Sequence, residues 1–300
     1  MLQQRAMAFT LFASARVYLG KSHDLNPGEF LEPRVMTDHP IVAREVHVLS
    51  VCGPVREENQ DAGVAWRGED GEWVVMISDG MGGHAAGREA AEIVVRACLD
   101  AIRKRTEGPW EEVLRTAVGA AHAAVLKAAR NLQGRSSMGA TAALAVVDGG
   151  PSSPRLHIAH VGDSRVYLHR GRSLYRLTSD HSLVAQMVRD GLLSEEEAFG
   201  HPDSNVIQRA IGQEARLEAE VQGPILLDDA DVVLICSDGL HGAVPDEQIG
   251  EAIDRSSSVD KMCHNLLTAA FDAGSQDNIT IGCIRLVADR PQRRPTRVHD

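Results

Sequence analysis

Residues 74–80 read VVMISDG and residues 232–239 read VVLICSDG, and this repeated phrase decides how the chain is organised. Each phrase is a run of β-branched and aliphatic residues, typical of a buried strand, that stops at an aspartate and a glycine. Because glycine has no Cβ, the backbone can turn sharply there and its carbonyl can approach a ligand closely. We therefore expect Asp79 and Asp238 to follow two buried strands and to lie at the rim of a sheet.

Two more aspartates occupy similar places in the sequence. Asp163 follows the strand-like segment HIAHV at residues 157–161, and Asp277 precedes ITIGCI at residues 279–284. Carboxylates brought together would repel one another, by about 4 kcal/mol for a pair ~4 Å apart at an effective dielectric constant of about 20. Bound cations remove that repulsion, and ligands that are all oxygen suit Mg²⁺ or Mn²⁺ better than Zn²⁺. The four aspartates therefore predict one acidic metal centre.

The histidines give little support for zinc. The sequence contains no H-E-x-x-H motif, and His157 and His160 stand three residues apart on a predicted strand. Side chains alternate along a strand, so these two rings are expected on opposite faces of the sheet.

Composition narrows the class of protein. The 300 residues are 43% hydrophobic and 24% charged, which is ordinary for a globular protein with a sizeable core. The net charge of −11 argues against nucleic acid as the main partner, and no apolar stretch reaches the ~20 residues that span a bilayer. Five scattered cysteines without a C-x-x-C motif favour the reducing cytoplasm. A short apolar run at residues 6–13, followed by Ala13-Ser14-Ala15, leaves a signal peptide as a weaker alternative.

The pattern along the chain predicts an α+β fold. Residues 1–40 form an irregular N-terminal extension, residues 41–289 a folded domain, and residues 290–300 a basic C-terminal tail. We expect strands at 45–51, 73–77, 140–147, 155–161, 165–169, 174–177, 231–236 and 279–287. We expect helices at 87–105, from Pro109 through Ala128, at 246–254 and at 259–273, with short helices and loops between 180 and 211. Because strands come in runs and helices in pairs between them, antiparallel sheets are favoured over a parallel sheet.

Seven short motifs then occur in a specific order. They are VREENQDA at 55–62, DGMGGH at 79–84, SMGAT at 137–141, VGDSR at 161–165, SDHS at 179–182, SDGL at 237–240 and DNIT at 277–280. Any one of them occurs by chance, but the ordered set is specific. It resembles the PPM/PP2C family of metal-dependent serine/threonine phosphatases in its bacterial form, over about residues 45–287.

The resemblance implies a fold and an activity. The fold would be a PP2C-like four-layer αββα sandwich, in which two antiparallel β-sheets are flanked by pairs of α-helices. The activity would be hydrolysis of phosphoserine and phosphothreonine in proteins, by direct attack of a water or hydroxide that bridges two Mn²⁺ or Mg²⁺ ions. It also implies a third, weaker metal site and signalling substrates phosphorylated by a serine/threonine kinase. We expect the protein to be a monomer.

The resemblance also implies metal ligands. Asp79 would bridge both metals, and the Gly80 carbonyl would bind one of them. Asp238 and Asp277 would complete the shell of the first metal. Asp163, together with Asp238, would hold the third.

Further residues would act around the metals. Arg56 would bind the substrate phosphate and, with Asp79 and Asp238, is counted as catalytic. Asp61 would lie near the second metal through a water, and Asn278 would orient Asp277. Residues from about 180 to 204 would form a flap beside the site.

The sequence departs from the family pattern at three places. Gln60 stands where some members have glutamate, which removes one carboxylate near the second metal. Met81 stands where eukaryotic members often carry a histidine proposed as general acid. Residues 52–54 read Cys-Gly-Pro where polar residues are more usual, and the sequence alone does not explain them.

Two other functions compete with this interpretation. Gly162-Asp163-Ser164 and Asp238-Gly239-Leu240-His241 resemble motifs of GDSL esterases, so Ser164, His241 and Asp238 could form a serine-hydrolase triad. That alternative leaves Asp79 and Asp277 unexplained. The other alternative is a catalytically inactive binding module that keeps the PP2C fold.

Overall fold

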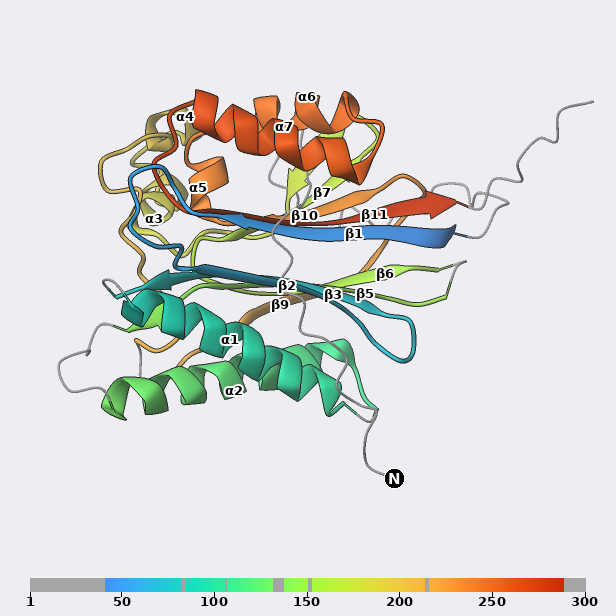
Figure 1. Cartoon of the computed structure of the whole chain (residues 1–300), viewed down its shortest axis with the longest axis horizontal. Helices are drawn as coiled ribbons and strands as arrows, with labels where there is room; N and C mark the ends of the chain where they lie inside the picture. Colours follow the sequence, from blue (N-terminus) through green and yellow to red (C-terminus); the bar gives the residue numbers. More distant parts are fainter. Residues whose placement is uncertain are drawn as a thin grey trace, which may run out of the picture.

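The computed structural model of the protein describes residues 41–82, 85–105, 107–131, 138–150, 153–213 and 216–288. The predicted N-terminal extension (1–40) and basic tail (290–300) lie outside these ranges. Two antiparallel sheets stack face to face, and a pair of helices covers the outer face of each (Figure 1). The predicted α+β sandwich is therefore confirmed.

The first sheet is drawn in the upper half of Figure 1. Its strands, in spatial order, are β1 (Ile41–Val51), β11 (Ile279–Ala288), β10 (Val232–Cys236), β7 (Arg165–Arg170) and β8 (Ser173–Arg176). The second sheet contains β2 (Asp61–Arg67), β3 (Trp73–Met81), β5 (Ala142–Asp148), β6 (Arg155–Val161) and β9 (Glu220–Leu226), and the short β4 (Gly139–Ala140) pairs with the end of β3. All of these strand pairs are antiparallel.

The helices follow from amphipathic stripes and from their end residues. The second sheet is covered by α1 (Ala85–Arg103) and α2 (Trp110–Asn131), and the first by α6 (Asp246–Asp254) and α7 (Val259–Asp272). Glu111 and Glu112 in the first turn of α2, with Arg130 in its last, complement the helix dipole. The described residues also form three short helices, namely α3 (Leu183–Arg189), α4 (Glu195–Ala198) and α5 (Asp238–His241).

Apolar side chains fill three layers, one between the sheets and one under each helix pair. The middle layer contains Ile77, Ile158, Ile235 and Ile284, each at most 1% exposed. Burying one such side chain contributes about 1.5–3 kcal/mol to folding, so this layer fixes the spacing of the sheets.

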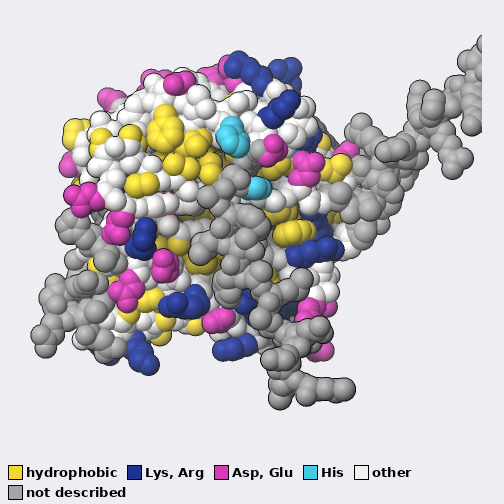
Figure 2. All heavy atoms as spheres, viewed as in Figure 1, with side chains coloured by type: hydrophobic (Ala, Val, Ile, Leu, Met, Phe, Trp, Pro, Cys, Tyr) yellow, Lys and Arg dark blue, Asp and Glu magenta, His cyan; other side chains and the backbone are white. Residues whose placement is uncertain are grey.

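The face drawn in Figure 2 carries acidic and basic side chains interspersed with one another. Among the residues that the structure describes, no helix combines the length and apolarity that crossing a membrane requires.

Three strands and one helix differ most from the sequence-based expectation. β3 continues to Met81, so Asp79 and Gly80 lie inside the strand rather than beyond it, because β2 and β4 keep pairing with that end. β2 and β9 were not predicted: β2 is only half-buried, and β9 contains a glycine and a proline that resemble a turn. Asp238 begins the single helical turn α5 instead of lying in a loop.

The antiparallel registers bring the predicted site residues to one end of the sandwich. The end of β3 pairs with the start of β2, which places Asp79 opposite Asp61. The end of β10 pairs with the start of β11. Asp238 comes just after β10 and Asp277 just before β11, so both lie at that same end. The β6–β7 turn that carries Asp163 adjoins them, because β7 pairs with β10.

Candidate active site

Asp61 and Asp79 form the centre of the site as cross-strand partners on β2 and β3. Side chains of directly opposed residues point to the same face, so the two carboxylates lie side by side. Ser237 Oγ donates a hydrogen bond to Asp61 Oδ2 at 2.8 Å and accepts one from the backbone nitrogen of Thr280 at 2.9 Å. Ser237 therefore fixes the position of Asp61 from the opposite sheet.

Asp238 joins this pair from the start of α5. Its carboxyl group lies close enough to Asp79 for its charge to act on that residue. Burial, reinforced by Asp277, raises the pKa of Asp238 to about 6. Burial also raises the pKa of Asp61 to about 7, although hydrogen bonds from Thr280 and Ser237 oppose that shift. Burial, and then the charges of Asp61 and Asp238, raise the pKa of Asp79 well above its ordinary value.

Asp277 stands in a tight turn before β11. Its Oδ1 accepts a hydrogen bond from the backbone nitrogen of Asn278 at 2.7 Å. The Asn278 side chain is buried, and its Oδ1 accepts from the backbone nitrogen of Gly53 at 3.2 Å. A Cβ on Gly53 would overlap the Asp277 carbonyl. This close approach explains the glycine in Cys52-Gly53-Pro54, and it ties the loop that carries Arg56 to the turn that carries Asp277.

Arg56 lies at the open edge of the cluster. Its Nη2 forms an ion pair with Asp277 Oδ2 at 2.5 Å, and 45% of its side chain is exposed. Its backbone nitrogen donates to the Gly53 carbonyl at 3.1 Å, which closes the loop. The guanidinium is thus held beside the carboxylates and remains accessible from solvent.

Gly80 lies where three backbone segments converge. A Cβ on Gly80 would overlap the carbonyls of Gly87 and Gln60, and one on Gly87 would approach the Gly80 carbonyl at 2.6 Å. Only glycine permits this approach, which packs the first turns of α1 against the end of β3. The carbonyls of Gly87 and Gln60 consequently lie close to the backbone of Gly80, the residue after Asp79.

Thr141 connects Asp79 with the turn at Asp163. Its Oγ1 accepts from the backbone nitrogen of Asp79 at 2.8 Å, and its own nitrogen donates to the Asp79 carbonyl at 2.8 Å. Thr141 Oγ1 also lies 2.6 Å from Ser164 Oγ, and both hydroxyls are fully buried.

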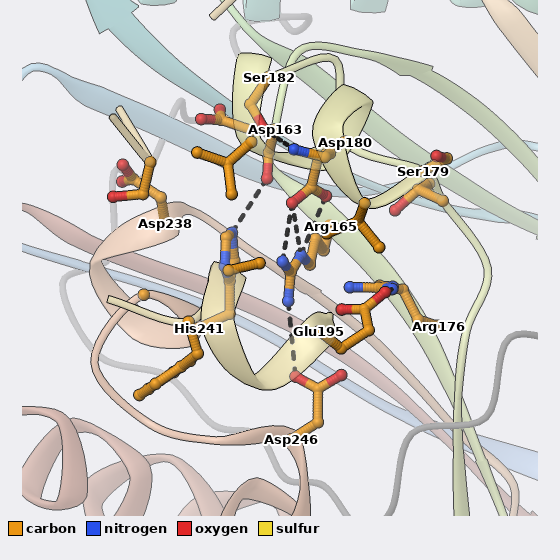
Figure 3. Close-up of a pocket in the computed structure, with 18 of the residues that line it drawn as sticks. Asp163, Arg165, Arg176, Ser179, Asp180, Ser182, Glu195, Asp238, His241 and Asp246 are labelled. Atoms are coloured by element: carbon orange, nitrogen blue, oxygen red, sulfur yellow. Dashed lines mark hydrogen bonds and ion pairs between the residues drawn. The ribbon is translucent and has the colours of Figure 1, made fainter. Parts of the chain in front are cut away.

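These contacts do not favour the esterase triad. Ser164 Oγ is engaged with Thr141. His241 Nε2 instead lies 3.0 Å from the Asp163 carbonyl oxygen, the contact drawn as a dashed line in Figure 3. Burial, and then the charge of Arg165, lower the pKa of His241 to about 3, so its ring is neutral and donates its Nε2–H to that carbonyl.

A second histidine holds the same turn from the other side. The backbone nitrogen of His181 donates to the Gly162 carbonyl at 2.8 Å, and His181 Nδ1 accepts from the Gly162 nitrogen at 3.0 Å. Because Nδ1 is an acceptor, the ring hydrogen must reside on Nε2, which donates to Glu220 Oε1 at 2.8 Å. Glu220 thereby fixes the tautomer of His181, and His181 fixes the peptide before Asp163. The sequence analysis missed this pair, although the SDHS motif contained its signal.

His160 adds a third ring to this region. Its ring centroid lies 4.8 Å from that of His181, and ligand atoms of His160, His181 and Glu220 all lie within 4.8 Å of one another. The trio does not make a metal site in this arrangement, because His181 Nε2 carries its hydrogen and has no lone pair to offer. His157 contacts Asp148 and Trp110 instead, so the two strand histidines lie on opposite faces as expected.

The acidic cluster fits divalent cations. Asp163 Oδ1 and Asp238 Oδ1 are buried and have no hydrogen-bond partner among the described residues. Burial, and then the charge of Asp238, raise the pKa of Asp163 well above its ordinary value. Buried carboxylate oxygens without donors, next to backbone carbonyls, are the ligands that Mg²⁺ and Mn²⁺ prefer.

A cavity of about 990 Å³ opens beside Asp163 and Asp238, which stand on its wall. Figure 3 shows Arg165 between Asp180 and Asp246 in this cavity. The Nη2 of Arg165 lies 2.7 Å from Asp180 Oδ2, and its Nη1 lies 3.5 Å from Asp246 Oδ1. Burial opposes ionisation of Asp180, but Arg165 outweighs it and lowers the pKa of Asp180.

Comparison with known proteins decides the family. The sequence profile of Protein phosphatase 2C matches residues 55–273. This chain belongs to the protein phosphatase 2C family. The predicted family, fold and enzyme class, a metal-dependent serine/threonine phosphatase, are thereby confirmed, and neither the esterase nor the inactive binding module is favoured.

Individual relatives agree with this assignment. The serine/threonine phosphatase stp of Listeria welshimeri is 33% identical over 233 residues, which cover 76% of this chain and 90% of that protein. The crystal structure of Stp1 from Staphylococcus aureus has a TM-score of 0.75 at 28% identity and covers 86% of this chain and 99% of that one. The catalytic domain of the phosphatase PstP, solved in complex with two manganese ions, has a TM-score of 0.70 at 30% identity and covers 81% and 98% of the two chains.

Mn²⁺ is expected to raise the melting temperature more at high pH than at low pH. The folded, metal-free protein retains protons on Asp61 (pKa about 7) and Asp238 (pKa about 6) that the unfolded chain releases near pH 3.8. Their burial therefore lowers stability as pH rises through this window, whereas metal binding, which requires the ionised form, strengthens. Melting curves with EDTA and with Mn²⁺, from about pH 5 to about pH 7.5, measure the difference. Asp79→Asn should abolish most of the rise in melting temperature that Mn²⁺ causes. A rise that stays constant with pH would contradict this explanation.

Replacing Glu220 should weaken the metal site through His181. In Glu220→Leu, the His181 Nε2–H loses its acceptor, and the Gly162–Asp163 turn loses its support. We expect the Mn²⁺ concentration for half-maximal activity to rise about tenfold, a typical effect of removing an outer-shell partner. Glu220→Gln keeps an acceptor oxygen and should stay within about twofold of the wild type. Equal effects of the two substitutions would show that this hydrogen bond has no such role.

Proposed function

We propose that this chain removes phosphate from phosphoserine and phosphothreonine in proteins at the carboxylate cluster described above. The observation that carries the proposal is the convergence of five aspartates at one end of the sandwich, namely Asp61, Asp79, Asp163, Asp238 and Asp277. A buried acidic cluster of this kind needs cations, and membership of the protein phosphatase 2C family supplies the reaction.

Mn²⁺ or Mg²⁺ is the required cofactor, as the family and the two manganese ions of PstP support. We propose Asp79, the Gly80 carbonyl, Asp238 and Asp277 as ligands of two ions, and Asp163 with Asp238 as ligands of a weaker third. When bound, such ions lower the pKa of a water, align it with the phosphorus and stabilise the departing oxygen.

The remaining residues position these groups and the substrate. Asp61, fixed by Ser237, lies where it can orient a water beside the second ion. Asn278 holds both the Asp277 turn and the Gly53 loop, so it sets the distance between the metal centre and Arg56. The planar guanidinium of Arg56 matches two phosphate oxygens and is exposed enough to reach them.

The setting of the reaction is also proposed. We assign the phosphatase domain to residues 41–289, with a flap at about 180–204. Its substrates would be phosphoproteins generated by a serine/threonine kinase. The enzyme would act as a monomer in the cytoplasm, where its five free cysteines stay reduced. Size-exclusion chromatography with light scattering tests the monomer directly.

Asp79→Asn and Asp238→Asn are each expected to remove nearly all activity, by about a thousandfold or more, because each removes a charge that holds cations in place. Release of phosphate from p-nitrophenyl phosphate and from a phosphopeptide with Mn²⁺ measures the loss. Circular dichroism checks that the fold persists, and Asp70→Asn in an exposed turn serves as control. Near-wild-type rates in either variant, or full activity in EDTA, would refute the proposed centre.

Arg56→Ala is expected to raise KM by about tenfold or more and to change kcat less, since Arg56 binds phosphate in the ground state as well as in the transition state. Arg56→Lys should recover only part of the loss, because an ammonium group cannot make the bidentate contact. Steady-state kinetics on a phosphopeptide measures both constants. An unchanged KM would remove Arg56 from the phosphate site.

A further inference from the structure

The cavity next to Asp163 and Asp238 extends away from the proposed metal centre. It runs between the segment that leads into α3 and α4 on one side and α5 with the start of α6 on the other. A phosphorylated side chain in the site belongs to a peptide whose neighbouring residues must lie on the adjacent surface. Residues follow one another at about 3.3 Å along an extended chain, so the first few flanking residues reach this cavity.

Negative charge predominates on the walls of this cavity. Seven carboxylates line it, from Asp163, Asp180, Glu195, Glu196, Asp238, Asp246 and Glu247. Three guanidinium groups line it, from Arg165, Arg176 and Arg189. Among the lining residues that the structure describes, the negative charges therefore exceed the positive ones by four, and by two if bound cations neutralise Asp163 and Asp238.

The three arginines are already engaged within the protein. Arg165 pairs with Asp180 and Asp246, and Arg176 Nη2 lies 2.7 Å from Glu195 Oε1. Arg189 Nη1 donates to Ser179 Oγ at 3.0 Å and to the Asp180 carbonyl at 3.1 Å. An acidic peptide would have to displace these contacts to find a cation.

The exposed part of the lining carries negative charge, which would attract a cationic side chain of a peptide. Glu196, in the first turn of α4, and Glu247, in the first turn of α6, are both exposed lining residues. Apolar side chains lie between the charged ones, including Val184, Val188 and Phe199, the last 46% exposed. Lysine and arginine side chains match such a surface, because an aliphatic stem packs on apolar groups while the charged head reaches a carboxylate.

We propose that this cavity is a specificity subsite for lysine or arginine residues that flank the phosphorylated serine or threonine. The proposal rests on the proposed function, since it assigns a substrate class to that same site. It predicts that the enzyme discriminates among phosphopeptides by flanking charge, and that Glu196 and Glu247 contribute to this discrimination.

The test compares two phosphoserine peptides that differ only in carrying arginine or glutamate at the positions flanking the phosphoserine. Phosphate release with Mn²⁺ gives kcat/KM for each. We expect the arginine peptide to be favoured by about tenfold at low ionic strength, with the ratio shrinking as salt is added. Equal values, or a preference for the glutamate peptide, would overturn the subsite.

Variants separate the subsite from the catalytic centre. The double variant Glu196→Gln/Glu247→Gln should lower the ratio between the peptides about threefold, while hydrolysis of p-nitrophenyl phosphate, which has no flanking residues, stays unchanged. Glu112→Gln on α2, at the opposite side of the molecule, is the matched control and should leave the ratio unchanged. If the double variant keeps the wild-type ratio of kcat/KM between the two peptides, the assignment to this cavity is overturned. If the wild type does not hydrolyse p-nitrophenyl phosphate with Mn²⁺, the proposed function is overturned, and the subsite with it.

Discussion

Mutual repulsion among buried carboxylates is the constraint on which this structure depends. Asp61, Asp79 and Asp238 come from three different strands or strand ends and meet where solvent cannot screen their charges. The metal-free protein relieves this by retaining protons, as the raised pKa values of these groups indicate. Divalent cations relieve it more completely, so the affinity for metal and the cost of the empty cluster share one physical origin.

The surrounding fold supplies the geometry that holds these charges. Two hydroxyl groups, from Ser237 and Thr141, connect residues that are far apart in sequence, and both are fully buried. Glycines at 53, 80 and 239 let backbone segments approach more closely than any side chain would permit. Stability and the proposed function are therefore linked here, because the packing that orders the rim of the sandwich also fixes the proposed metal ligands.

Much of this could be predicted from the sequence. Runs of buried-strand residues that end in Asp-Gly located Asp79 and Asp238, and helix periodicity located the two helix pairs. Pairing between strands could not be predicted in the same way, because register is a long-range property of the fold. The half-buried β2 was therefore missed, and with it the position of Asp61 directly opposite Asp79. The roles of His181 and His241 depend on contacts across 19 and 78 residues, which local patterns do not reveal.

The ion pair between Arg56 and Asp277 has a consequence for the order of events in the catalytic cycle. In the structure, the arginine is the counter-ion of Asp277, a carboxylate that we propose as a metal ligand. Metal binding at the proposed centre would weaken the ion pair between Arg56 and Asp277, so the guanidinium could bind another anion. The affinity for cations and the affinity for the substrate phosphate would thus be thermodynamically linked, and binding of either ligand would strengthen binding of the other by the same factor.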